Sequence, residues 1–431
     1  MAPAWPGCTQ QQACCSLLLG IPGPSGGAIP GERSAVMASL PGPVPPFEPS
    51  VKFHANVTFD NESFYRSEGD TWPTAWLADG SQLSACGDRS IPVVSPMSLF
   101  RVDGTPASGT PNGGDEFTTT PMTGPLPVDP AVFCADVPVP PGGRPASVKP
   151  TTLLSVDGQV YWGIACMTYG DEPRFERQHN YHAWIAKALN PEGDRWNFSA
   201  TPAAFFTGKL AAPMLLQYGK DNALAFDNYI YAHFPCASDF GTTSGRAESF
   251  WNNNDAILLG RVPKDRVLER SSWQFWAGNG GDGDGDGDGV WSFNETEAVS
   301  IMNYSLMIGM NQVTYHPGSG RLLMANFGFI DLNGQPRPWH THPDLDHHRT
   351  QLTLLEAEKP WGPFRIFHRD DSWQSPDKSG GGYCPIIPAK WLTATTAWVV
   401  SGQCCNMASM DDSRAANHYN FTTQRISFSY V

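Results

Sequence analysis

The 431-residue sequence contains no apolar stretch long enough to cross a bilayer as a helix, and it is poor in positive charge. Its 28 lysine and arginine residues are outnumbered by 42 aspartate and glutamate residues, so the formal net charge is −14 at pH 7. A chain this acidic repels phosphate backbones and anionic lipid headgroups. These shortages predict that neither nucleic acid nor a membrane is a partner.

Familiar metal-binding spacings are also lacking. The ten cysteines include adjacent pairs at positions 14–15 and 404–405, which do not have zinc-ligand spacing, and the even number permits disulfides without assigning them. Residues 280–289 alternate glycine and aspartate but lack the glutamate of an EF-hand loop. Residues 340–348 hold histidines and aspartates with no helix to align them. We interpret both stretches as loops, and we predict no metal and no cofactor.

A clear leader sequence is missing as well. Residues 14–21 make a poor hydrophobic segment for a signal peptide, because no lysine or arginine precedes them. Residues 1–50 are rich in Pro, Gly, Ser and Ala, which predicts a disordered lead before one domain over residues 51–431. Six Asn-x-Ser/Thr acceptor sequences nevertheless favour a secreted glycoprotein. They begin at Asn56, Asn61, Asn197, Asn294, Asn303 and Asn420. We therefore predict an extracellular or secretory-pathway protein.

What the chain does contain is a strong hairpin signal over residues 69–88. Two short strands flank an Asp79-Gly80 turn, a dipeptide typical of tight β-hairpins. A turn at that point places Asp70 opposite Asp88, and facing residues in such a pair have Cβ atoms about 4.5–5.5 Å apart. Two carboxylates that close raise the pKa of one of them, as in the acid and base pairs of glycoside hydrolases. The alternative interpretation is a pair of solvated acids at the strand ends.

The same pattern recurs four more times, at intervals of about 70 to 90 residues, with little helical periodicity between the copies. The further copies span Thr151 to Met167 around Asp157-Gly158, Asp221 to Phe234 around Asp227-Asn228, Asn311 to Asn326 around Pro317-Gly318, and Tyr383 to Ser401 near Thr393. Five strand-rich units predict an all-β chain folded as a five-bladed β-propeller with long decorating loops. Pro73 suits the innermost strand of a blade, because proline is tolerated on a sheet edge.

In this arrangement the starts of the first strands gather at one mouth of the central channel. Besides Asp70 and Asp88, the predicted ring consists of Lys149, Lys220, Asp221, Asn311, Gln312, Tyr383 and Ser401. Such a mixture of charges, amides and an aromatic ring suits a sugar site. Trp72 and Trp76 are either wedges between blades or a platform on which a sugar stacks. Each residue alone is as well explained as a polar strand end or a core aromatic.

Several motifs in the chain resemble one family. They are Asp70-Thr71-Trp72-Pro73-Thr74 with Gly87-Asp88, Leu259-Gly260-Arg261-Val262-Pro263-Lys264-Asp265, Val313-Thr314-Tyr315-His316-Pro317-Gly318 with Asn326-Phe327-Gly328, and Glu356-Ala357 with Pro360-Trp361-Gly362-Pro363-Phe364. In this order, from about Phe64 to the C-terminus, they resemble domain of unknown function 4185, a family of five-bladed propellers that includes endo-D-arabinanases. The resemblance implies that the two catalytic aspartates are Asp70 and Asp88.

The leading hypothesis is a secreted, monomeric glycoside hydrolase that cleaves a polysaccharide or oligosaccharide, arabinan-like by resemblance. Asp70 and Asp88 serve as the acid and the base or nucleophile, and Asp221 tunes the site. Carboxyl groups about 5 Å apart favour retention of configuration, and groups about 6.5–9.5 Å apart favour inversion. The alternatives are a non-catalytic carbohydrate-binding propeller and a structural extracellular propeller whose acids are merely solvated.

Overall fold

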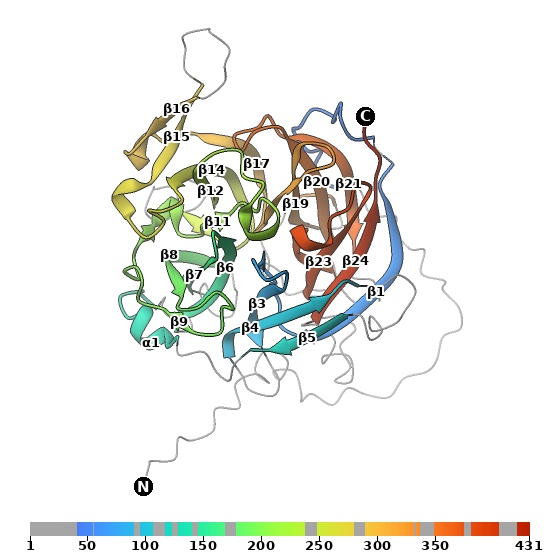
Figure 1. The fold of residues 1–431 in the computed structure, drawn as a ribbon. Helices are drawn as coiled ribbons and strands as arrows, with labels where there is room; N and C mark the ends of the chain where they lie inside the picture. The colour runs from blue at the N-terminus through green and yellow to red at the C-terminus, as the bar shows by residue number, and fades with distance from the viewer. Residues whose placement is uncertain are drawn as a thin grey trace, which may run out of the picture. The chain divides into compact units, whose positions relative to one another are not determined.

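The computed structural model describes residues 41–54, 56–89, 95–106, 117–122, 128–139, 145–168, 178–237, 248–279, 289–331, 333–336, 349–374, 381–404 and 420–431. Within these ranges it describes the backbone alone for residues 60–68, 88–89, 95–96, 117, 403–404 and 420. The described chain forms five antiparallel sheets arranged around a central axis (Figure 1). The predicted five-bladed β-propeller is confirmed.

Each sheet is one blade, and its first strand lies nearest the axis. Blade 1 consists of β2 (Thr74–Trp76), β3 (Gln82–Arg89), β4 (Ser95–Gly104) and β5 (Phe117–Pro121). Blade 2 consists of β6 (Ser147–Val156), β7 (Gln159–Thr168) and β8 (His179–Ala188), with β9 (Trp196–Asn197), β10 (Phe206–Thr207) and β13 (Ser249–Phe250) all paired to β8. Blade 3 consists of β11 (Met214–Leu215), β12 (Tyr229–Cys236), β14 (Asn254–Pro263), β15 (Gln274–Gly278) and β16 (Val290–Ser292), with β17 (Ser300–Ile308) paired to β14.

The last two blades have four strands each. Blade 4 consists of β18 (Val313–His316), β19 (Arg321–Ile330), β20 (Arg349–Ala357) and β21 (Arg365–Trp373). Blade 5 consists of β22 (Gly381–Ile386), β23 (Thr396–Cys404), β24 (Asn420–Ser427) and β1 (Thr58–Glu68). Because β1 comes from the start of the propeller and pairs with β24 from its end, the ring is closed by backbone hydrogen bonds. The sheets of blades 2 and 3 contain six strands each.

Helix is scarce in the described residues. It is limited to α1 (Pro130–Phe133) and to 3-10 turns at Gly208–Leu210, Lys220–Asn222, Arg270–Ser272, Glu295–Glu297 and Ala389–Trp391. None of the helices in the described ranges is both long and apolar enough to span a membrane.

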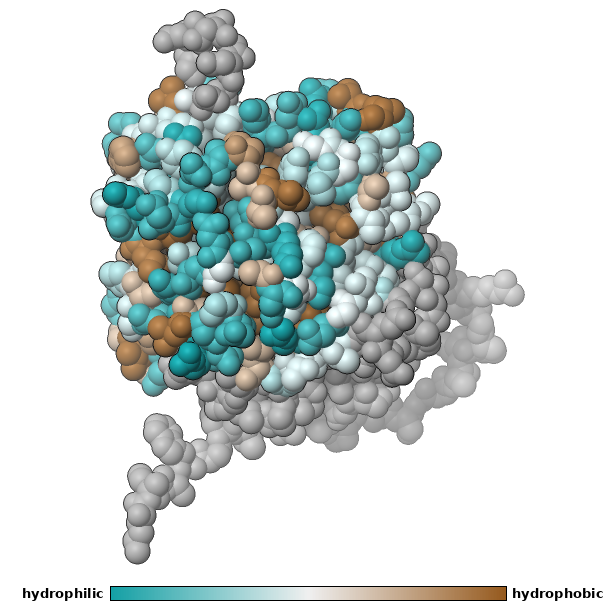
Figure 2. Space-filling view, viewed as in Figure 1, coloured by the Kyte–Doolittle hydropathy of each residue, from teal (hydrophilic) through white to brown (hydrophobic). Residues whose placement is uncertain are grey.

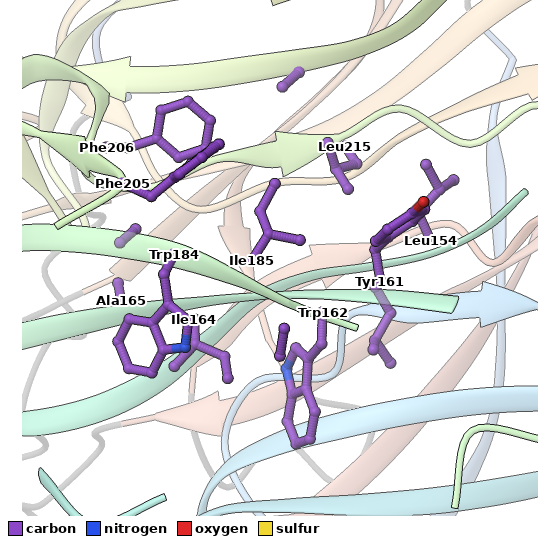
Figure 3. Packing of buried hydrophobic residues seen from close by; sticks show 14 of the residues in the cluster. Leu154, Tyr161, Trp162, Ile164, Ala165, Trp184, Ile185, Phe205, Phe206 and Leu215 are labelled. Carbon is purple, nitrogen blue, oxygen red and sulfur yellow. The ribbon is translucent and has the colours of Figure 1, made fainter. Parts of the chain in front are cut away.

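The core lies between neighbouring blades. In the largest cluster, the indole rings of Trp162 of β7 and Trp184 of β8 point to one side of blade 2, and Phe206 and Leu215 lie on its other side (Figure 3). Aromatic side chains fill such wedge-shaped spaces because each buries about 150–250 Å² of surface. The face of the described residues shown in Figure 2 is mostly hydrophilic or intermediate in hydropathy, with scattered apolar patches.

The propeller begins earlier than predicted. Contacts divide the chain into residues 1–38 and a large unit from Ser39 to Val431. The backbone of Gly42 accepts from Arg369, the Pro43 carbonyl accepts from Tyr304 at 2.7 Å, and Pro49 forms a bridge with Ile366. Residues 41–50 therefore pack on blades 3 and 4, and the predicted boundary at residue 51 is about ten residues late. The rest of the predicted disordered lead lies outside the described residues.

Candidate functional site

The site begins with a buried ion pair beside the central axis. Asp70 precedes β2 and is 6% exposed, and Lys149 near the start of β6 is 1% exposed. The Lys149 Nζ lies 3.5 Å from Asp70 Oδ2, so the pair joins blade 1 to blade 2. Each of these buried charges needs the other, because a single unpaired charge at this depth would strongly destabilise the folded protein. Both residues belong to the ring predicted from the sequence, and the structure brings them together.

Two glycines make room for Asp70. A Cβ at Gly87 would collide with the Asp70 carboxylate and lie 3.3 Å from the Lys149 Cδ. A Cβ at Gly402 of blade 5 would collide with the Asp70 carbonyl. The backbone around Asp70 is therefore enclosed by blades 1, 2 and 5, and any side chain at either glycine would displace the acid.

Cys384 is the residue that sequence analysis missed. It lies in β22 with φ of +48°, which is uncommon for a residue with a side chain and is found often at functional sites. Burial, followed by the charge of Asp70, raises the pKa of the Cys384 thiol well above its usual range, while Tyr383, Lys149 and Trp251 oppose this shift. The thiol therefore keeps its proton at neutral pH. Its strained backbone was not recognisable from the sequence, because no turn signal marks it.

A small pocket of about 10 Å³, with room for about one water molecule, adjoins this group. Its lining comes from four blades and includes Thr71, Thr151, Asn311 and Cys384, together with Trp251, which follows β13. Among the described residues, the buried hydroxyl oxygens of Thr71 and Thr151 find no hydrogen-bond partner. Buried polar groups are normally paired, so these two hydroxyls are available to a bound ligand or water.

Asp88 lies where β3 ends, on the strand next to Asp70. The β2–β3 pairing has the predicted register, since Thr74 faces Ser84. Closer to the site the backbone N–H of Asp70 donates to the Gly87 carbonyl at 3.1 Å, one residue short of Asp88. Pro73 cannot donate to the ladder, which accounts for the local irregularity. The side chain of Asp88 lies outside the described part of the chain, so its distance from Asp70 stays a prediction.

Lys220 and Asp221 do not belong to this group. Asp221 accepts from the Ser155 hydroxyl at 2.6 Å and from the Gly158 backbone N–H at 2.9 Å, at the turn between β6 and β7. That turn is at the opposite end of β6 from Lys149. Lys220 lies at the same far end, with its Nζ 3.7 Å from a Cβ placed on Gly80. The prediction that they share the mouth with Asp70 is wrong.

The cause is the hairpin of blade 3. Its inner strand is β11, where Met214 pairs with His233, and not residues 221–226 as the Asp227-Asn228 turn had predicted. The chain then makes a long connection to β12 that includes the turn Lys220–Asn222. The inner strand of blade 3 therefore lies earlier in the sequence than predicted. Asp221 comes after the end of that strand and lies at the opposite end of the propeller from Asp70.

The two candidate sugar platforms are not at the pocket either. Trp72 is fully buried between blades 1 and 5, with ring centroids 5.5 Å from Phe100 and 5.0 Å from Phe421. Trp76 is only partly buried, and it lies at the end of β2, six residues after Asp70 in the sequence. Trp72 is thus a wedge between blades, and the tryptophan at the pocket is Trp251.

The remaining predicted residues do converge near the axis. Asn311 lines the pocket. The Gln312 side chain accepts from the Thr74 backbone N–H at 3.0 Å and donates to the Thr74 hydroxyl at 3.2 Å, which ties blade 4 to blade 1. Tyr383 is buried beside Cys384, with its ring 5.3 Å from Phe327. The Gly-Asp stretch, apart from Gly289, and the histidine-rich stretch lie outside the described residues.

Comparisons with known proteins give fold-level likeness only. No family model matches the sequence, and no curated protein matches it. A putative hydrolase from Bacteroides ovatus is 13% identical, with a TM-score of 0.48 over 85% of this chain and 87% of that one. A GH43_1 enzyme from Xanthomonas citri is 11% identical, with a TM-score of 0.41 over 85% and 88%. An alpha-L-arabinofuranosidase from Podospora anserina in complex with cellotriose is 8% identical, with a TM-score of 0.40 over 90% and 95%. Glycoside hydrolases are thus among the solved structures that the chain is similar to.

Proposed function

We propose that the protein is a secreted glycoside hydrolase that cleaves a polysaccharide, arabinan-like by the resemblance of its motifs, with Asp70 and Asp88 as the reacting carboxyl groups. The observation that carries the proposal is the buried pair of Asp70 and Lys149 beside a pocket to which four blades contribute. Burying charges this deeply is costly, and charges kept in spite of that cost are found often at functional sites.

The pair also suggests which carboxyl group acts as the base or nucleophile and which as the acid. An ammonium beside a carboxylate favours its charged form, so Asp70 is suited to act as base or nucleophile. Asp88 then supplies the proton to the departing sugar oxygen, as the two-carboxyl mechanism requires. The protonated thiol of Cys384 and the hydroxyls of Thr71 and Thr151 offer neutral contacts to sugar hydroxyl groups.

Export is supported by two features. The chain has a disulfide between Cys134 and Cys166, and disulfides form mainly in oxidising compartments. The asparagines of all four acceptor sequences with described side chains are exposed, as glycosylation requires. They are Asn56, Asn197, Asn294 and Asn303.

The test is release of reducing ends from a panel of furanoside and pyranoside polysaccharides. Asp70→Asn and Asp88→Asn should each abolish turnover and leave glycan binding measurable, because an amide can neither exchange the proton nor form a glycosyl ester. Asp157→Asn is the matched control, since Asp157 is an exposed turn residue at the other end of β6. A parent protein that binds glycans and releases no reducing ends would instead establish the non-catalytic binding alternative.

A further inference from the structure

A second group of reactive side chains lies on the outer part of blade 2. Cys134 directly follows α1, Cys166 is in β7, and His182 faces Cys166 across the pair β7–β8. The two sulfur atoms and a ring nitrogen of His182 all lie within 4.8 Å of one another, and all three residues are buried. In the structure the two sulfur atoms are joined as a disulfide.

The hydrogen bond of His182 sets which nitrogen of the neutral ring is the donor. Its Nε2 lies 3.1 Å from the carbonyl oxygen of Phe133, which can only accept, so Nε2 carries the hydrogen. Nδ1 is left with its lone pair and lies 3.8 Å from Asp136 Oδ1, too far for a hydrogen bond. An imidazole that donates one nitrogen to a backbone carbonyl and leaves the other open is the arrangement typical of a metal ligand.

We propose that, once the disulfide is reduced, Cys134, Cys166, His182 and Asp136 bind a thiophilic divalent cation, with zinc as the best match. Two thiolates, an imidazole and a carboxylate are a suitable tetrahedral set, with bonds of about 2.3 Å to sulfur and 2.0 Å to nitrogen. Breaking the sulfur–sulfur bond lets the sulfur atoms separate to the roughly 3.8 Å that such a site requires. The Asp136 side chain is 73% exposed and free to move inward.

The chemistry balances with a thiol or phosphine reductant. The disulfide takes up two electrons and two protons to give two thiols. A thiol reductant supplies both and is oxidised to its disulfide, whereas a phosphine is oxidised to its oxide by taking oxygen from water, which also supplies the two protons. Zinc then displaces the two thiol protons as the thiolates bind. The disulfide and the metal are therefore alternative links between the α1 segment and β7, selected by the redox state of the surroundings.

The test uses the full chain, reduced with a phosphine under anaerobic conditions and titrated with Co²⁺ and then Zn²⁺. We expect one equivalent of Co²⁺ to give a thiolate-to-metal charge-transfer band that Zn²⁺ abolishes, and no band from the oxidised chain. Because other cysteines also bind cobalt, Cys134→Ser must remove the band. His182→Asn should weaken binding at least tenfold. Cys236→Ser, which changes a free buried cysteine of blade 3, is the matched control and should have no effect.

Absence of the band in the reduced chain, or its survival in Cys134→Ser, would overturn the proposal. Reduction also removes a covalent link, so circular dichroism must accompany the titration. If reduction lowers the thermal midpoint, zinc should restore it in the parent chain but not in His182→Asn, and a failure to restore it in the parent would count against the site.

Discussion

The two ends of the propeller use the same kinds of residue in different ways. At one end Asp70 lies beside the buried ammonium of Lys149 and a pocket. At the other end Asp221 accepts from a backbone N–H and a hydroxyl at a turn, and Lys220 is exposed. An acid held by neutral donors stabilises a turn, whereas an acid paired with a buried cation marks a candidate site. The sequence alone did not separate the two.

Trp72 and Trp76 give the largest expected difference in stability. Trp72→Ala should lower the free energy of unfolding by about 3–5 kcal/mol, because it empties a fully buried wedge between blades 1 and 5. Trp76→Ala should cost less than half of that, since its side chain is partly exposed. Equilibrium unfolding in urea measures both. Equal losses would mean that Trp76 is also a core residue.

Substitutions of Lys149 and Lys220 test the difference between the two ends of the propeller. Lys149→Met leaves the Asp70 carboxylate buried without its cation, and should cost about 3–5 kcal/mol at pH 7. Lys220→Met should change the free energy of unfolding by less than about 0.5 kcal/mol, as is usual for an exposed side chain. The same denaturation assay separates them. A mild effect at Lys149 would show that water reaches the pair.

Buried His233, which contacts the pocket residue Asn311, predicts a pH dependence of stability. Burial lowers the pKa of this histidine from 6.5 to about 4. Between pH 6.5 and about 4, His233 is protonated in the unfolded chain but not in the folded chain. The free energy of unfolding therefore falls as the pH is lowered through this window. The loss from this residue should reach about 3 kcal/mol. His233→Gln should flatten the unfolding free energy over that range, and an unchanged slope would assign the effect to other groups.

The N-terminal boundary gives the smallest predicted effect. Deleting residues 1–38 leaves every described contact in place, and the unfolding free energy should stay unchanged. Deleting residues 1–45 removes the hydrogen bond from Tyr304 to Pro43 and the bonds made by Gly42, which should cost about 1–3 kcal/mol. Thermal melts of the two truncated chains test this. Identical melts would mean that residues 41–45 add nothing to the propeller.

Tight turns made most of the fold predictable. Asp157-Gly158 is a two-residue turn, and the register it predicted for β6 and β7 is the one observed next to the turn. Blade 3 was misread because β11 has only two residues, and the connection to β12 contains a second turn signal at Asp227-Asn228. A short strand carries too few side chains to reveal a period of two.

The site was predictable only in part, for a related reason. Lys149 was found because it starts a long, regular strand after a clear turn. Cys384 was missed because its importance depends on a left-handed backbone and on charges from other blades, which no local pattern records. Asp221 was misplaced together with its strand.

The central claim is that Asp70 performs chemistry, and reducing-end release by charge-matched variants tests it most directly. Asp70→Asn alone leaves the Lys149 ammonium buried without its carboxylate, which by itself destabilises the protein. The double variant Asp70→Asn with Lys149→Met removes both charges and therefore serves as the comparison. Lys149→Met alone completes the cycle. If the parent cleaves a glycan, we predict that both variants carrying Asp70→Asn are folded at the assay temperature, bind that glycan and release at least a thousandfold fewer reducing ends. Turnover within tenfold of the parent in the folded double variant would contradict the account.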